Sequence, residues 1–157
     1  MADLTFTLAD ETATASLGEK LAPLLRTGDV VGLSGPLGAG KTTLARGLIA
    51  ALTGAVEAPS PTFTLVEAYE TKAFVLWHFD LYRLERPEDV WELGLEEALA
   101  SGVALIEWPE RIAAILPPES LVVRLNPSGS GRAARVRGGG DWPARLAASA
   151  FVNPRIA

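Results

Sequence analysis

Hydrophobic positions in the first third of the chain switch between a helical spacing and short apolar runs. In residues 11–25 apolar side chains recur at intervals of three and four, which predicts an amphipathic helix. Residues 29–34, DVVGLS, are mostly apolar, which predicts a short buried strand. Residues 41–54, KTTLARGLIAALTG, then predict a second helix that stops at Gly54.

The remainder of the chain continues this alternation. Residues 59–70 begin as a proline-stiffened loop and become strand-like, and residues 121–138 predict two strands around a Gly/Ser turn. Asp141 and Pro143 are the predicted N-cap and first-turn residues of a terminal helix. Further strands are predicted at residues 73–80 and 103–108, and helices at residues 86–102 and 141–151. The pattern predicts an α/β fold with a mixed, mainly parallel sheet, helices on both faces and a C-terminal hairpin.

Composition limits the compartment and the partners. The chain has 157 residues, 48% of them hydrophobic, and no apolar run of about 18 residues, so we expect one domain at 1–157 without a membrane span. The N-terminal sequence lacks the basic-then-apolar order of a signal peptide, and cysteine is absent, so we expect a cytoplasmic protein without disulfides. A net charge of −5 argues against a surface that grips nucleic acid directly.

A glycine-rich stretch joins the strand at residues 29–34 to the following helix. Gly35, four further residues and Gly40-Lys41-Thr42 make a complete G-x-x-x-x-G-K-T, the phosphate-binding P-loop (Walker A) motif. Its backbone N–H groups and the helix N-terminus suit phosphates, Lys41 suits the β- and γ-phosphates, and the Thr42 hydroxyl suits Mg²⁺. A glycine-rich turn without function is disfavoured, because both the spacing and the flanking elements fit the motif.

Two acidic residues close predicted strands and are candidates for a second Mg²⁺ ligand. Asp80 ends residues 73–80, and Glu107 follows the apolar run VALI. Open α/β sheets bind ligands at the carboxyl ends of strands, and phosphoryl transfer needs an acid there to hold Mg²⁺. One such acid alone could simply cap a turn, but two in a P-loop chain indicate that at least one is functional.

His78 lies on the same strand face as Asp80, and we interpret it as a packed or hydrogen-bonded structural residue.

Four segments in fixed order carry a family resemblance. GPLGAGKTTLARG, SPTFTLVEAY, HFDLYRL and LIEW resemble the corresponding motifs of the TsaE (YjeE) family across residues 10–137. These are small bacterial P-loop ATPases required for the threonylcarbamoyladenosine modification of tRNA. The resemblance implies a P-loop NTPase-like fold, weak hydrolysis of ATP with Mg²⁺, partners similar to TsaD and TsaB, and contact with tRNA only through that complex.

The resemblance also implies roles for individual residues. Those implied to bind the nucleotide are Thr14, Gly38, Ala39, Gly40, Lys41, Thr42, Thr43 and Arg132. Those implied to bind Mg²⁺ are Thr42 and Glu107, and those implied to be catalytic are Lys41 and Asp80, the latter as an acid near the γ-phosphate. Those implied to form a conformational switch are Ser60, Pro61, Thr62 and Trp108.

The chain departs from the family pattern at two places. Pro36 stands where the family usually has an acid after the first P-loop glycine, and we expect little functional cost from this change. The turn NPSGSGRAARVRGGG is unusually rich in glycine and arginine, so the role given to Arg132 could belong to Arg135. Near the nucleotide base, Glu11 or Thr12 could replace Thr14.

Two other functions use the same phosphate-binding motif. A small-molecule or nucleotide kinase would need GSGRAARVRG as an arginine-bearing lid, and it would leave SPTFTLV unexplained. A GTPase would need the guanine-reading N-K-x-D pattern, which the sequence lacks. The partner-dependent ATPase is therefore the favoured function, with the kinase as the alternative.

Overall fold

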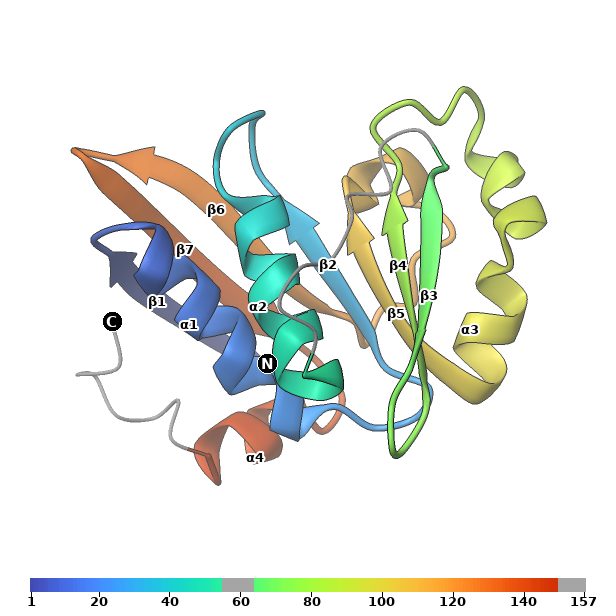
Figure 1. Cartoon of the computed structure of the whole chain (residues 1–157), viewed down its shortest axis with the longest axis horizontal. Helices are drawn as coiled ribbons and strands as arrows, with labels where there is room; N and C mark the ends of the chain where they lie inside the picture. Colours follow the sequence, from blue (N-terminus) through green and yellow to red (C-terminus); the bar gives the residue numbers. More distant parts are fainter. Residues whose placement is uncertain (55–63, 150–157) are drawn as a thin grey trace.

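Figure 1 shows the chain as a computed structural model that describes residues 1–54 and 64–149. The strands are β1 (Ala2–Leu8), β2 (Val30–Ser34), β3 (Val66–Glu70), β4 (Val75–Asp80), β5 (Gly102–Glu107), β6 (Leu121–Ser128) and β7 (Gly131–Gly138). The α-helices are α1 (Glu11–Leu21), α2 (Lys41–Thr53), α3 (Leu95–Ser101) and α4 (Trp142–Ala147). The 3₁₀ helices are η1 (Ala22–Leu24), η2 (Pro87–Leu93) and η3 (Pro109–Ile112).

The described strands form one mixed sheet in the order β1-β7-β6-β2-β5-β4-β3. Its four central strands, β6, β2, β5 and β4, are parallel to one another, whereas β7 and β1 on one side and β3 on the other are added by antiparallel pairing. The antiparallel pair β6–β7 is the predicted C-terminal hairpin. The carboxyl ends of β2, β4 and β5 point to the same, upper edge of the sheet in Figure 1, so this edge collects the residues that follow each strand.

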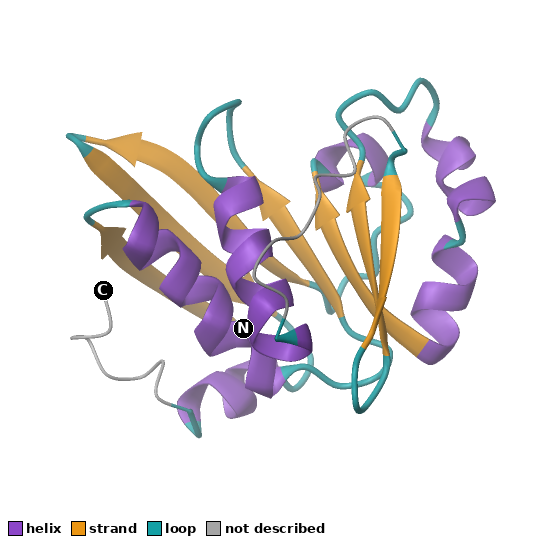
Figure 2. Cartoon of the chain, viewed as in Figure 1, coloured by secondary structure: helices purple, strands orange, loops and turns teal. Residues whose placement is uncertain are grey.

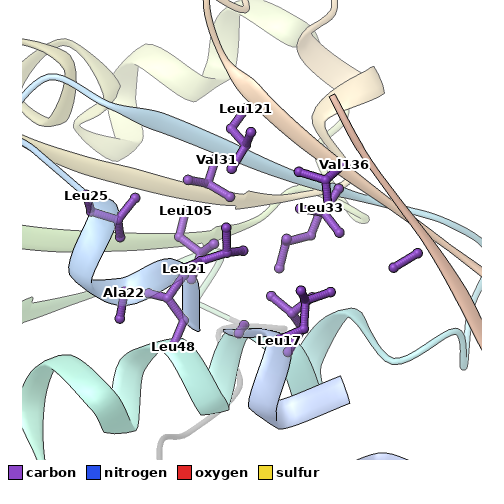
Figure 3. Packing of buried hydrophobic residues seen from close by; sticks show 14 of the residues in the cluster. Leu17, Leu21, Ala22, Leu25, Val31, Leu33, Leu48, Leu105, Leu121 and Val136 are labelled. Atoms are coloured by element: carbon purple, nitrogen blue, oxygen red, sulfur yellow. The ribbon is translucent and has the colours of Figure 1, made fainter. Parts of the chain in front are cut away.

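Helices α1 and α2 lie side by side across one face of the sheet (Figure 2). Their leucines interdigitate with apolar side chains of the central strands in the larger of the two hydrophobic clusters (Figure 3). The fully buried members shown there include Leu21, Val31, Leu33, Leu48 and Leu105. Burial of this apolar surface is the main driving force that holds the two helices on the sheet.

The opposite face is covered by η2, α3 and η3, which build a second hydrophobic cluster. Its fully or almost fully buried members include Phe79, Val90, Leu95, Ala104 and Ile106. Because alternate residues of β4 and β5 point to opposite faces, the same strands supply side chains to both clusters. The predicted α/β fold, with a mixed sheet and helices on both faces, is confirmed.

Two local predictions differ from the structure. The helix predicted at residues 86–102 is divided at Gly94, whose φ of 98° cannot continue a helix, so η2 and α3 are separate. No element is predicted for residues 2–8, yet they form β1, which pairs with β7 over its whole length. Among the described residues, no helix combines the length and the apolar character needed to cross a bilayer.

Arg145 fastens the terminal helix α4 to the loop before β2. Its guanidinium donates to both carboxylate oxygens of Asp29, at 2.6 and 2.8 Å, and to the backbone oxygen of Leu24. It also lies over the ring of Trp142, 4.1 Å from the centroid. Asp141 occupies the predicted N-cap position but makes no side-chain cap bond, because its carboxylate accepts from Arg145 instead.

Helices α1 and α2 approach each other through glycines. A Cβ on Gly18 would collide with the backbone oxygen of Leu44, and one on Gly47 would collide with that of Ala15. Neither glycine is needed for a special backbone angle, since both lie within regular helix. The two positions therefore set the distance between the helices, and through it the place of α1 beside the start of α2.

Replacing Gly47 by alanine is expected to destabilise the fold. Overpacking should cost about 1–3 kcal/mol of unfolding free energy, although alanine is the better helix former by about 1 kcal/mol. The measurement is urea-induced unfolding of the Gly47→Ala protein. Gly139→Ala is the matched control, because the nearest atom to its added methyl lies 3.6 Å away. Equal stability of the two variants would contradict the close helix contact.

Candidate nucleotide-binding site

The loop between β2 and α2 has a backbone that only glycine adopts easily. Gly38 and Gly40 have φ values of 76° and 103°, in the left-handed region. Gly35 has no room for a side chain, because a Cβ would collide with the backbone oxygen of Leu125. Since α2 begins at Lys41, its first N–H groups have no intrahelical partner and can receive an anion. The structure thus has the strand, loop and helix that the motif requires.

A cleft of about 720 Å³ opens above this loop, a size that suits a small-molecule ligand. The sequence-predicted residues that line it are Thr14, Gly38, Gly40, Lys41, Thr42, Thr43, Asp80, Glu107, Trp108 and Arg132. Ala39 does not line the cleft: its methyl is fully buried in the core and its N–H donates to the Pro36 oxygen. The fold therefore gathers residues from distant parts of the sequence around one cavity.

The Lys41 ammonium is hydrogen-bonded to the backbone of the loop itself. Its Nζ donates to the backbone oxygens of Gly35, at 2.6 Å, and Pro36, at 2.8 Å, and it lies 4.2 Å from the ring centroid of Trp108. Burial lowers the pKa of Lys41 below its usual range, and the nearby carboxylates of Glu107, Glu110 and Asp80 partly oppose this effect. Binding a phosphate would let this poorly hydrated cation exchange neutral carbonyls for charged oxygens.

Glu107 shares its carboxylate between two donors. The Thr42 hydroxyl donates to Oε1 at 3.0 Å, and His78 Nε2 lies 2.7 Å from Oε2. Asp80 pairs with Glu107 across β4 and β5, so both acids project from the same face at the same edge. Asp80 is 7% exposed, and its Oδ1 accepts from the backbone N–H of Tyr82.

Trp108 turns sharply away from the end of β5. Its φ of 63° is unusual for a bulky residue and lets its N–H donate to the Leu33 oxygen. The indole lies over Lys41 on one side and contacts the ring of Tyr82, with centroids 4.9 Å apart. Trp108 therefore contacts the P-loop lysine directly, so movement of Lys41 would change the surroundings of the indole.

The two candidate arginines of the hairpin point to different places. Arg132 donates from Nε to the Ala39 oxygen at 2.8 Å and from another nitrogen to the Gly38 oxygen at 2.9 Å, so it is hydrogen-bonded directly to the P-loop backbone. Arg135 instead donates to both carboxylate oxygens of Asp3, which holds the pKa of Asp3 below its usual value. Of the two, only Arg132 lines the cleft.

The N-terminal side of the cleft comes from the first turn of α1. The Thr14 hydroxyl donates to the backbone oxygen of Asp10, and its methyl lies near the position that a Cβ on Gly40 would take. Asp10 and Glu11 also line the cleft, whereas Thr12 does not. The close contact between α1 and α2 is what brings this turn to the P-loop.

Several cleft residues were not predicted, and some predicted residues are not described. Ala9, Asp10, Leu37, Tyr82, Arg83, Ser130 and Gly131 line the cleft without having been singled out. Tyr82 and Arg83 directly follow β4, so the rule that ligands bind at strand carboxyl ends could have found them. The predicted switch residues Ser60, Pro61 and Thr62 lie outside the described residues.

Comparison with known proteins gives close relatives. The family described as "Threonylcarbamoyl adenosine biosynthesis protein TsaE" matches residues 8–135. The chain is 44% identical over 119 residues to the tRNA threonylcarbamoyladenosine biosynthesis protein TsaE of Rickettsia felis, covering 75% of this chain and 70% of the relative. It is 37% identical over 132 residues to the protein of that name from Haemophilus influenzae, covering 80% and 84%. The crystal structure of Bacillus subtilis YdiB superposes with a TM-score of 0.78 at 29% identity, covering 94% and 93%.

Replacing Lys41 by alanine should weaken nucleotide binding about 10- to 100-fold, the loss expected for one strong charged hydrogen bond. The measurement is titration with a fluorescent ATP analogue, with circular dichroism to verify folding. Lys72→Ala is the matched control, because Lys72 is exposed in the turn between β3 and β4 and does not line the cleft. Unchanged affinity in Lys41→Ala would refute the phosphate-binding assignment.

Proposed function

Because the chain belongs to the TsaE family, which matches residues 8–135, we propose that it binds and hydrolyses ATP in the service of tRNA threonylcarbamoyladenosine formation. The relatives are named for that biosynthesis. The observation that carries the ATP assignment is the meeting of Lys41, Thr42 and Glu107 at the floor of the cleft. A phosphate cradle, a lysine and an acidic strand end are the parts that P-loop ATPases share.

The oxygen donors at the cleft floor fit Mg²⁺. Thr42 offers a hydroxyl and Glu107 a carboxylate, and their oxygens lie 3.0 Å apart. Mg²⁺ prefers oxygen ligands and usually binds through one or two side chains together with phosphates and water. Bound here, it would neutralise charge on the β- and γ-phosphates during transfer.

The remaining chemistry falls to Lys41 and Asp80. In hydrolysis, a water oxygen bonds to the γ-phosphorus while the bond to the bridging oxygen of ADP breaks, which yields ADP and phosphate. We assign Lys41 to the phosphate oxygens and Asp80 to the orientation of the attacking water. The place of Asp80 beside Glu107 at the edge of the cleft supports this role. Trp108, in contact with Lys41, is the proposed sensor of nucleotide state.

The proposed partners are proteins similar to TsaD and TsaB, through which the chain would reach tRNA in the cytoplasm. A net charge of −5 favours this indirect route over direct binding to tRNA. The geometry also speaks against the kinase alternative. Its lid would have to be the segment at residues 129–138, which the structure has as a turn and a strand paired with both β6 and β1.

Neutral replacements of the two acids should separate their roles. Glu107→Gln should raise the Mg²⁺ concentration needed for half-maximal ATPase activity about 10-fold or more, because a metal ligand loses its charge. Asp80→Asn should lower kcat by about 100-fold with little change in the Mg²⁺ requirement. The two proteins are compared by ATPase assays at graded Mg²⁺ and saturating ATP. The reverse pattern would mean that the two assignments must be exchanged.

The isolated protein should hydrolyse ATP slowly, and the partner pair should accelerate it. Arg132 already donates to the backbone oxygens of Gly38, Ala39 and Gly131, so it is poorly placed to stabilise the transferring phosphoryl group. An arginine supplied from outside is worth about 10³–10⁵ in rate. Phosphate release is measured for the protein alone and with the TsaD- and TsaB-like pair at fixed Mg²⁺ and ATP. Rapid turnover alone, about ten per second and unchanged by the pair, would contradict partner control.

A further inference from the structure

A buried hydrogen bond joins the only histidine of the chain to the acid proposed as a metal ligand. His78 Nε2 lies 2.7 Å from Glu107 Oε2, and the two side chains are 1% and 3% exposed. We propose that His78 is a positioning residue that fixes the Glu107 carboxylate for Mg²⁺ and nucleotide. This inference rests on the proposed function, because it assigns Glu107 to the metal.

The two oxygens of Glu107 have different tasks. Oε2 is hydrogen-bonded to the buried His78, and Oε1 accepts from the hydroxyl of Thr42 at the start of α2. A carboxylate only accepts hydrogen bonds, so the proton between the two groups belongs to Nε2 of the ring. Anchoring one oxygen removes the rotational freedom of a long side chain before any metal binds, which raises metal affinity.

Packing alone is a poor explanation for a histidine here. Nδ1 of His78 is buried and has no hydrogen-bond partner among the described residues. A buried polar atom without a partner is unfavourable, so an apolar side chain would serve a purely structural role better. The one polar contact of the ring that the structure gives is the bond to Glu107. The unfavourable burial of Nδ1 is therefore explained by the hydrogen bond that Nε2 makes to Glu107.

The sheet register keeps His78 away from the ligand itself. His78 pairs with Leu105, and the next outward pair on the same face is Asp80 with Glu107. His78 thus lies one step deeper in the sheet and does not line the cleft. The contact with the site that the structure gives it is the hydrogen bond to Glu107, so its role is to position that carboxylate and not to touch the ligand.

Two amide variants test the positioning role. In glutamine the terminal nitrogen takes the place of Nε2, and in asparagine it takes the place of Nδ1, so only His78→Gln retains a donor that reaches Glu107. The probe is a fluorescent ADP analogue, titrated with MgCl₂ and separately in EDTA. His78→Asn should need about 10-fold more Mg²⁺ for half-maximal enhancement of binding. His78→Gln should remain within about threefold of the parent protein, below the loss expected for a missing outer-sphere partner.

The same titrations include outcomes that would overturn the inference. A parent-like Mg²⁺ requirement in His78→Asn, or an equal shift in both variants, would show that the hydrogen bond to Glu107 does not matter. Weaker binding of the ADP analogue by His78→Asn than by the parent protein in EDTA would also overturn the inference, because a loss without metal points to general damage of the cleft. If His78→Asn fails to fold, His78→Leu is measured in its place. Leucine fills the site without any hydrogen-bond donor, so the same increase in the Mg²⁺ requirement is expected.

Failure of the proposed function gives a different result. A parent protein that does not bind the analogue, or binds it equally with and without Mg²⁺, would refute the nucleotide–metal assignment itself. A parent protein with clear Mg²⁺ dependence that His78→Asn or His78→Leu retains would refute only the positioning role. In a Glu107→Ala background, replacing His78 should no longer change the Mg²⁺ requirement, since the group it positions is gone.

Discussion

The parallel register of β2, β5 and β4 is the constraint on which the candidate site depends. Because parallel strands end at one edge, the P-loop, Asp80 and Glu107 meet although long stretches of chain separate them. The alternation of side chains then places both acids on the face covered by α2. A shift of one residue in the pairing of β4 with β5 would turn both Asp80 and His78 toward the other face and dismantle the site.

Elements outside the P-loop complete the cleft from two further directions. Gly18 and Gly47 let α1 approach α2 closely, which brings the first turn of α1 and Thr14 to the loop. From the other side the β6–β7 hairpin delivers Arg132, which donates to two P-loop carbonyls. The loop is therefore held by packing from one neighbour and by hydrogen bonds from the other, so its shape depends on the whole fold.

The sequence predicts those parts of the molecule that follow from local pattern. The buried strand, the P-loop and α2 were all readable, because glycine spacing and apolar periodicity encode them directly. Strand β1 was missed, although Leu4, Phe6 and Leu8 alternate in it, because an edge strand of this kind needs a partner to be recognised. The choice between Arg132 and Arg135 could not be made, since the register of the hairpin decides which side chain reaches the P-loop.

The site also carries unfavourable electrostatics that stability alone does not explain. Two carboxylates stand as neighbours across β4 and β5, and like charges in such pairs destabilise a sheet. Lys41 is buried with a lowered pKa, and Nδ1 of His78 finds no hydrogen-bond partner within residues 1–54 and 64–149. Each feature costs folding free energy, yet together they form a place where a divalent cation and a polyphosphate would find complementary charge. A ligand that binds only the folded state raises the free energy of unfolding, by about 2.7 kcal/mol when its free concentration is a hundred times its dissociation constant. The same residues that weaken the free protein would thus make its stability depend on the occupied site.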